Sequence, residues 1–265
     1  MVDYKIIAEE YQTTDIALVS LAKKYKTCPN RFSKYLKKQN ILTKRKVFFE
    51  DRLFKTIDSE EKAYWLGFLY ADGCVTYSTN KHRYVIEICL AEKDKLHIEK
   101  FKIFLNTLTT IKYREKTKAF RLSICSKLMC EDLINLGCFS NKSLTLQFPT
   151  EEQVPKEFIK HFIRGYFDGD GCISNGNVSL LGTFEFLNSI KELFNFAELP
   201  ISKDKRHLNN TFYLRFRRAE SSLFLHTIYN NSNVYLERKY NKYVDISYSS
   251  AGKKFLNLLN KTNNK

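Results

Sequence analysis

Two aspartates end similar segments of the chain. Asp72 is the eighth residue of "WLGFLYADG" (residues 65–73), and Asp170 has the same place in "IRGYFDGDG" (residues 163–171). Both segments predict helices, yet each ends in an acid, where the negative end of the helix dipole disfavours a carboxylate. Carboxylate and carbonyl oxygens that converge at such a place would bind a hard divalent cation. The two acids are therefore candidate metal ligands.

Small residues recur at every fourth position of these helices, namely Ala63, Gly67 and Ala71 in the first and Gly165 and Gly169 in the second. Positions four apart lie on one helical face, and small residues there let two backbones approach closely. Glycine costs a helix about 1 kcal/mol relative to alanine, so a compensating contact is expected. We predict that the two helices pack through these faces and bring Asp72 and Asp170 side by side.

The similarity of the two halves extends beyond these helices. "ICLAEKDKLHIEKFKIFLN" resembles "VSLLGTFEFLNSIKELFNF", and each predicts a short strand that enters an amphipathic helix. Each half is predicted to run helix, hairpin, helix, hairpin, helix, over residues 61–150 and 151–265, which indicates a monomer with a pseudo-twofold axis. A single Asp-Gly pair would favour the simpler interpretation of a helix stop. Two pairs in register within a repeated unit favour a shared chemical role.

These residues resemble the paired motifs of the LAGLIDADG homing endonucleases, in the single-chain form with two motifs. The resemblance implies an α+β fold in which two pseudo-symmetric αββαββα units form a saddle on DNA. It also implies that Asp72 and Asp170 bind Mg²⁺, or Mn²⁺ as a substitute, with help from the backbone carbonyls of Ala71 and Gly169. The first motif departs from the family at its sixth position, which is Tyr70.

The resemblance further points to one lysine per half near the active centre, matched by Lys142 in "FSNKSLTL" and Lys239 in "YLERKYNKY". An ammonium group there would stabilise the developing phosphoanion or help to activate the attacking water. In the family, a polar residue that closes the second strand also contributes. The matching positions in this chain are Glu92 and Gly182, so only Glu92 is a further catalytic candidate.

Polar and apolar side chains alternate in the strands predicted for "TIKYREKTK", "ISKDKRH" and "TFYLRFRR". Because successive side chains of a strand point to opposite faces, cations would share one face of each sheet. We expect this face to bind the major groove, where Arg and Lys contact guanine edges and phosphates. A solvated basic face is the alternative. The candidate DNA contacts are Lys112, Arg114, Lys116, Lys118, Lys203, Lys205, Tyr213, Arg215 and Arg217.

Residues 1–45 predict a separate helix-turn-helix domain, joined to the rest by a linker over residues 46–60. "DYKIIAEEY", "DIALVSLAKKY" and "RFSKYLKKQNIL" have helical spacing, and "TCPN" separates the last two. No Asp or Glu occurs between Ile16 and Phe49. The third helix would contact DNA, and a basic solvated three-helix bundle is the alternative. Its candidate contacts are Arg31, Lys34, Lys37 and Lys38.

The overall composition favours a polyanionic partner and an intracellular setting. The chain has 265 residues, and its 44 Lys and Arg against 29 Asp and Glu give a net charge of +15. Its seven cysteines form no C-x-x-C pair, which indicates a reducing compartment, such as a bacterial or phage-infected cytoplasm or an organelle. The sequence predicts no signal peptide and no membrane span.

These features predict a site-specific double-strand DNA endonuclease that depends on a divalent metal and acts as a monomer on a long asymmetric target. By family resemblance its cuts leave 3′ overhangs. Two alternatives are an intron RNA maturase and a DNA-binding regulator on a scaffold that no longer cleaves. The presence of both acids argues against the regulator, whereas no residue separates the maturase from the nuclease.

Overall fold

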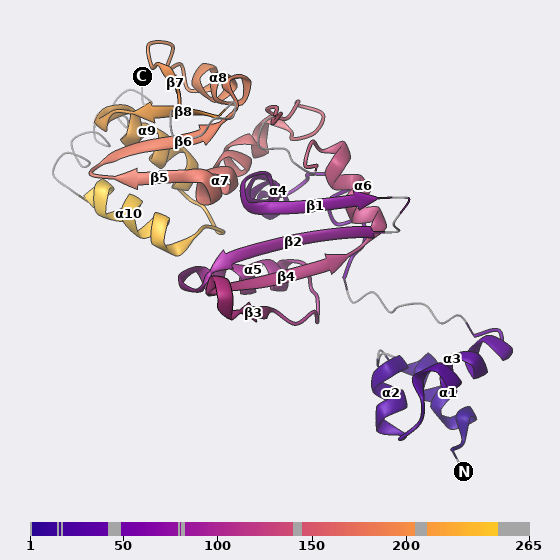
Figure 1. Cartoon of the computed structure of the whole chain (residues 1–265). Coiled ribbons are helices and arrows are strands. Elements are labelled where there is room, and N and C mark those ends of the chain that lie inside the picture. The colour runs from indigo at the N-terminus through magenta and orange to yellow at the C-terminus, as the bar shows by residue number, and fades with distance from the viewer. Residues whose placement is uncertain are drawn as a thin grey trace. The chain divides into compact units, whose positions relative to one another are not determined.

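The structure of the chain is a computed structural model, drawn in Figure 1. It describes residues 2–14, 16, 18–41, 49–78, 80, 83–139, 145–204 and 211–248. The chain divides into two compact units, Met1–Phe49 and Glu50–Lys265. Among the described residues, no helix has the length and the hydropathy that a bilayer crossing requires.

The smaller unit contains the predicted three helices. Asp3 caps the first helix by accepting a hydrogen bond from the Lys5 amide at 2.9 Å. Pro29 lies in the first turn of the third helix, where its missing amide hydrogen costs nothing. The helices are α1 (Tyr4–Thr13), α2 (Leu18–Lys24) and α3 (Pro29–Lys38). Their shared core consists of Ile7, Ala8, Tyr11, Leu21, Phe32 and Leu36.

The larger unit repeats one pattern of elements, which confirms the predicted α+β fold of two αββαββα halves. The first half contains α4 (Glu60–Asp72), β1 (Gly73–Ser78), β2 (Arg83–Ala91), α5 (Lys95–Phe104), β3 (Lys112–Arg114), β4 (Ala119–Cys125) and α6 (Lys127–Asn135). The second contains α7 (Ile159–Asp170), β5 (Gly171–Ser174), β6 (Asn177–Gly182), α8 (Phe184–Leu193), β7 (Ile201–Lys203), β8 (Phe212–Phe216) and α9 (Arg218–Tyr229), and α10 (Glu237–Tyr248) follows it.

Each half forms an antiparallel sheet of four strands, in the order β1-β2-β4-β3 and β5-β6-β8-β7. The register repeats as well, because Gly73 lies opposite Ile88 and Gly171 lies opposite Leu180. One face of each sheet is apolar and buried by helices, as strand alternation requires. The residues that build it are Ile86, Ile88, Leu122 and Ile124 in the first sheet, and Val178, Leu180, Leu214 and Phe216 in the second.

The second part of the predicted linker packs on the first half. Phe54 is fully buried, and its ring centroid lies 5.8 Å from that of Phe104. Arg52 forms an ion pair with the buried Asp132 at 2.6 Å. These residues belong to the larger compact unit, Glu50–Lys265. The partners of this packing lie far along the chain, so no local sequence pattern marks it.

Candidate active site

The two motif helices pack backbone against backbone. A Cβ atom added at Gly67 would lie 2.0 Å from the Phe162 carbonyl oxygen, and one at Gly165 would lie 1.9 Å from the Tyr64 carbonyl oxygen. Ala63, which lies on the same helix as Gly67, is completely buried. Figure 1 shows α4 and α7 side by side between the two sheets. The glycines therefore permit a close approach that no larger residue would allow.

This packing brings the ends of the two helices together. A Cβ atom at Gly169 would lie 2.2 Å from the Ala71 Cβ and 3.3 Å from Asp72 Oδ2. Asp170 is the next residue along the chain and ends α7, as Asp72 ends α4. Asp72 is exposed and Asp170 is half-buried. The two acids thus end adjacent helices, where two helix dipoles present their negative ends.

The donor set at this place suits a hard divalent cation. Carboxylates and carbonyls are its preferred ligands, and the negative helix ends add to the field that attracts it. Among the described residues, no group of three or more His, Cys, Asp or Glu side chains could hold a metal. An ion held by Asp72 and Asp170 would therefore take its remaining ligands from backbone carbonyls, water or a bound phosphate.

Lys239 lies buried at the C-terminal end of α7. Its Nζ donates to the backbone carbonyls of Phe167 at 2.5 Å, Asp168 at 2.8 Å and Gly169 at 3.3 Å. Burial lowers the pKa of Lys239 to about 8, and the negative charges of Asp168, Asp72 and Asp170 oppose this shift. A cation from α10 thus caps the end of α7 beside both candidate metal ligands.

The same contact bears on the Gly169 carbonyl, which the family resemblance assigns to a metal. This carbonyl already accepts the longest of the three hydrogen bonds from Lys239, so a metal would share it with the ammonium group. Lys142, the candidate lysine of the first half, lies outside the described residues, and so does Lys205.

Glu92 lies beyond the end of β2, in the 3₁₀ turn Glu92–Asp94, and is exposed. Its carboxylate accepts a hydrogen bond of 3.5 Å from the Tyr113 hydroxyl. The predicted correspondence of Glu92 with Gly182 is wrong. Counted from the strand pairs that follow each motif helix, Glu92 corresponds to Phe184, and Gly182 corresponds to Leu90. The first half has a 3₁₀ turn between β2 and α5, whereas β6 is followed directly by α8. An alignment of the two halves by sequence alone therefore pairs the wrong residues here.

A groove of about 1060 Å³ extends from Asp170 over the polar face of the second sheet. Its lining includes Cys172, Ser179, Ser202, Tyr213 and Arg215. These residues share one face because the register places Ser179 opposite both Cys172 and Arg215, and Tyr213 opposite Ser202. The Arg215 guanidinium lies 5.3 Å from the centroid of the Tyr213 ring. The groove thus joins a candidate metal ligand to a cation that faces solvent.

Two predicted members of this face do not follow the strand alternation. Lys203 pairs with Phe212, so it is out of alternation with Arg215, although it also lines the groove. Arg217 follows the last residue of β8 and occupies the N-cap position of α9. The prediction extended a single alternation along the segment, whereas β7 is only three residues long and β8 ends before Arg217.

The first sheet departs more strongly from the predicted alternation. Strand β3 contains only Lys112–Arg114, and Lys116 lies in the following 3₁₀ turn. Lys118 adopts a left-handed conformation with φ of 47°. The chain must reverse here to form β4, so the four cations do not share a strand face, although all are exposed. On the sheet itself, Arg114 lies opposite Ala119.

Glu87, which was not among the predicted site residues, pairs with two arginines of this sheet. Glu87 lies opposite Ser123 in the register, and its carboxylate accepts a 3.0 Å hydrogen bond from that hydroxyl. It also forms an ion pair with Arg121 and lies 3.7 Å from the Arg114 guanidinium. Nothing in the local sequence marks this group, because its members come from three strands.

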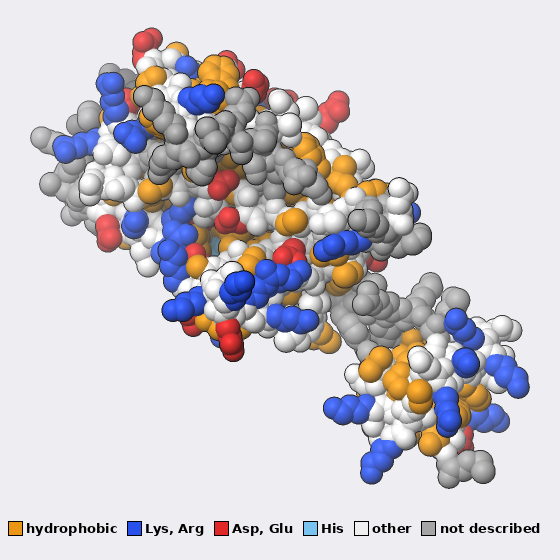
Figure 2. All heavy atoms as spheres, viewed as in Figure 1, with side chains coloured by type: hydrophobic (Ala, Val, Ile, Leu, Met, Phe, Trp, Pro, Cys, Tyr) orange, Lys and Arg blue, Asp and Glu red, His pale blue; other side chains and the backbone are white. Residues whose placement is uncertain are grey.

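The candidate contacts of the smaller unit lie on α3. Arg31, Lys34, Lys37 and Lys38 are exposed, while Phe32 and Leu36 of the same helix enter the core. Figure 2 shows that Lys and Arg side chains predominate over acidic ones on the visible face of this unit. The helix therefore presents one basic face and one apolar face.

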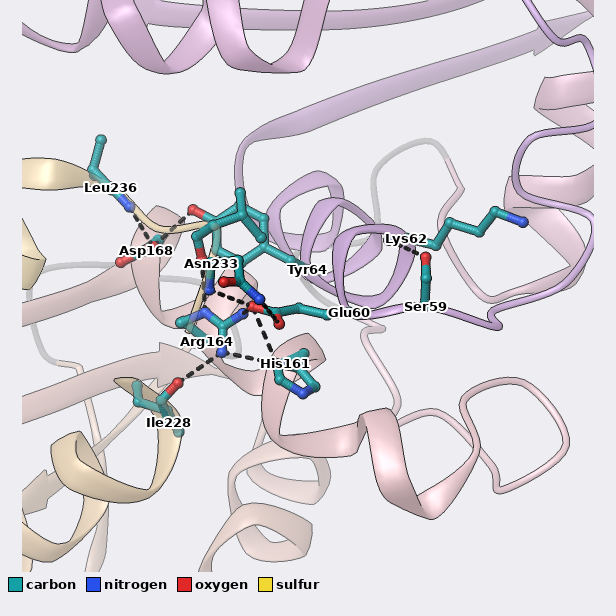
Figure 3. Close-up of polar contacts among 11 residues, drawn as sticks. Ser59, Glu60, Lys62, Tyr64, His161, Arg164, Asp168, Ile228, Asn233 and Leu236 are labelled. Carbon is teal, nitrogen blue, oxygen red and sulfur yellow. Dashed lines mark hydrogen bonds and ion pairs between the residues drawn. The ribbon is translucent and has the colours of Figure 1, made fainter. Parts of the chain in front are cut away.

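A buried polar network lies behind the site and was also missed. Asp168, the sixth residue of the second motif, accepts hydrogen bonds from the hydroxyls of Tyr64 and Tyr229. Arg164, one turn earlier on α7, forms a 2.6 Å ion pair with Glu60 (Figure 3). Burial raises the pKa of Asp168. A charged residue amid apolar ones in a motif helix was the signal available in the sequence.

Comparisons with known protein families and curated sequences match parts of this chain. Residues 59–133 match the family model described as a LAGLIDADG-like domain. The chain is 31% identical over 117 residues to the DNA-directed RNA polymerase subunit Rpo1C of Methanocaldococcus jannaschii, a match that covers 42% of this chain and 12% of that relative. The chain thus spans only a small part of the curated relative's length.

Among solved structures, the chain is similar to the LAGLIDADG meganuclease I-AabMI bound to uncleaved DNA. The two are 15% identical with a TM-score of 0.49, over 73% of this chain and 91% of the other. It is also similar to the I-LtrWI LAGLIDADG homing endonuclease bound to target DNA. That pair is 13% identical with a TM-score of 0.47, over 80% of this chain and 98% of the other.

Proposed function

We propose, from the match of residues 59–133 to the family model of a LAGLIDADG-like domain, that the chain is a site-specific DNA endonuclease of the homing type. It would hydrolyse both strands of a long asymmetric duplex target, with Mg²⁺ or Mn²⁺, and leave 3′ overhangs. The observation that carries this proposal is that Asp72 and Asp170 end two helices that pack closely together.

The residues of the site would have separate roles in hydrolysis. Asp72 and Asp170 would hold the cation, with the carbonyls of Ala71 and Gly169 as further ligands. A bound Mg²⁺ supplies Lewis acidity for the phosphate and lowers the pKa of the attacking water. Lys239 places a positive charge at the end of α7, where it would stabilise the charge that develops on the phosphate. Each half provides one acid, so a monomer suffices for two cuts.

The sheets would bind the duplex. Arg215 and Tyr213 line the groove that begins at Asp170, so base and phosphate contacts would lie on the side of that acid. The α3 cations of the smaller unit would add contacts and lengthen the target. All seven cysteines are among the described residues and none forms a disulfide, in keeping with the reducing compartment that we propose.

The decisive experiment incubates the protein with Mg²⁺ and a library of randomised duplexes and then sequences the cut ends. We expect both strands of one extended site to be cut with 3′ overhangs, and chelation of divalent cations to abolish the products. Selective binding without any cut would indicate the regulator. Preference for structured intron RNA over every duplex would indicate the maturase.

Replacing Arg215 with alanine should weaken DNA binding by about 1–3 kcal/mol and relax sequence preference, if its guanidinium contacts a base. Replacing Arg114 should cost less, because Glu87 already holds that guanidinium in the free protein. Titration of target and scrambled duplexes measures both effects. Lys127→Ala is the control, because Lys127 is an exposed residue of α6 that pairs with Glu131 and does not line this groove. An Arg215→Ala affinity equal to the control's would contradict the groove contact.

Deleting residues 1–49 should leave a folded larger unit, because that unit and the smaller one have separate cores. We expect the truncated protein to bind the target more weakly and to protect a footprint that is shorter at one end only. Footprinting of both proteins on one duplex makes the comparison. An unchanged footprint would show that α3 does not contact DNA.

A further inference from the structure

The connection between α9 and α10, residues 230–236, is fastened to the two motif helices. Glu60 of α4 accepts hydrogen bonds from the Asn233 backbone amide at 2.8 Å and from its side-chain amide at 2.9 Å. Arg164 of α7 donates from Nε to the Val234 carbonyl at 2.8 Å. Glu60 and Arg164 also pair with each other (Figure 3). The connection is therefore held by charged groups at its middle.

Asp168 fastens the same connection at its end. Its carboxylate is completely buried and accepts three hydrogen bonds, from Tyr64 at 2.7 Å, Tyr229 at 2.5 Å and the Leu236 backbone amide at 2.7 Å. A buried carboxylate is costly unless its oxygens are satisfied, and here both oxygens have donors. Loss of one of these donors leaves that cost unmet.

Leu236 links Asp168 to Lys239. Its amide binds the Asp168 carboxylate, while its carbonyl accepts the Lys239 amide at 3.0 Å in the first turn of α10. The Lys239 side chain then returns to the Asp168 backbone carbonyl at 2.8 Å. Both ends of this chain of contacts therefore lie on Asp168. Its side chain holds the residue before α10, and its backbone carbonyl accepts the Lys239 ammonium group.

The first half helps to hold this helix as well. Asp94 accepts a 2.8 Å hydrogen bond from Arg238, and Lys100 donates to the Tyr235 carbonyl at 3.1 Å. The sixth position of the first motif is built differently, because Tyr70 donates a single hydrogen bond to the Leu136 carbonyl. A tyrosine cannot accept the set of donors that Asp168 gathers. The two halves therefore secure their closing segments by unlike means.

We propose that Asp168 is a positioning residue that holds Lys239 at the end of α7, and that Tyr229 and the Leu236 amide transmit this constraint. The inference rests on the proposed function in one respect, the need for an ammonium group beside the acids. It assigns to one half of the protein a dependence on Asp168 that the other half lacks. Loss of the constraint would free Lys239 and slow one of the two strand cuts.

The first test measures the placement of Lys239 without any DNA. The full chain is labelled briefly with an amine-reactive acetylating reagent, and mass spectrometry follows each lysine. Lys239 should be labelled about tenfold faster in Asp168→Asn or Tyr229→Phe, the factor expected when a buried hydrogen bond is lost. Tyr166→Phe is the matched control, because Tyr166 lies on the same helix but donates to the Leu181 carbonyl at 2.7 Å.

The second test compares the two strand cuts on a plasmid that carries the target. Asp168→Asn and Tyr229→Phe should accumulate nicked circles, with DNA affinity in the absence of divalent cations unchanged, whereas Tyr166→Phe should linearise the plasmid at the parental rate. Unchanged labelling of Lys239 in both variants, or equal effects in Tyr166→Phe, would overturn the proposal. A protein that cuts no DNA would refute the endonuclease, and the labelling would still decide the role of Asp168.

Discussion

Asp72→Asn and Asp170→Asn should each slow DNA cleavage by roughly a hundredfold or more, because each removes a charge that would hold the catalytic cation. Each substitution keeps the shape of the side chain, and the close packing of α4 and α7 does not depend on the lost charge. Binding should persist, since the proposed contacts come from the sheets and α3. Removal of a negative charge beside the duplex should, if anything, strengthen it.

The measurement pairs single-turnover cleavage at several Mg²⁺ concentrations with binding in the absence of divalent cations. Asp58→Asn is a suitable control, because Asp58 is a surface acid near the other end of α4, where it pairs with Lys62. Because the two halves differ at the sixth motif position, which is Tyr70 in one and Asp168 in the other, we expect the two variants to leave different residual nicking activities. Full double-strand cleavage by both variants would reduce the two acids to helix stops.

Gly67→Ala and Gly165→Ala should each lower the free energy of unfolding by about 3 kcal/mol or more, at the upper end of the range for overpacked cores. The added Cβ would lie 2.0 Å or 1.9 Å from a backbone carbonyl oxygen of the facing helix. Backbone atoms cannot turn aside as the end of a side chain can. The helices would have to separate, which would also move Asp72 away from Asp170.

Chemical denaturation of the purified variants measures this effect. Gly176→Ala provides the comparison, because among the described residues, its chain neighbours aside, no atom lies within 4 Å of the added Cβ, and strain would come from the φ of 73°. That strain is worth about 1–2 kcal/mol. If the helix variants were no less stable than this control, the backbone contact between α4 and α7 would be wrong.

The sequence by itself determined the repeated halves and their two acids. Asp72 and Asp170 could be recognised as candidate metal ligands because the motif is short, local and present twice, so each copy supports the interpretation of the other. The small residues of α4 and α7 followed from helical periodicity, and the apolar face of β8 followed from strand alternation. Each of these signals depends only on residues within a few turns or along one strand.

Only the tertiary structure decided which residues surround the acids. The chain reverses between β3 and β4, so Lys116 and Lys118 lie outside the strand, and the pairing of β7 with β8 puts Lys203 out of alternation with Arg215. Glu87 and its arginines come from separate strands. Asp168 and Lys239 meet through residues of α4, α7 and α10, which lie far apart in the sequence. Local periodicity gives the face of an element, but register and long-range hydrogen bonds depend on which distant segments pack together.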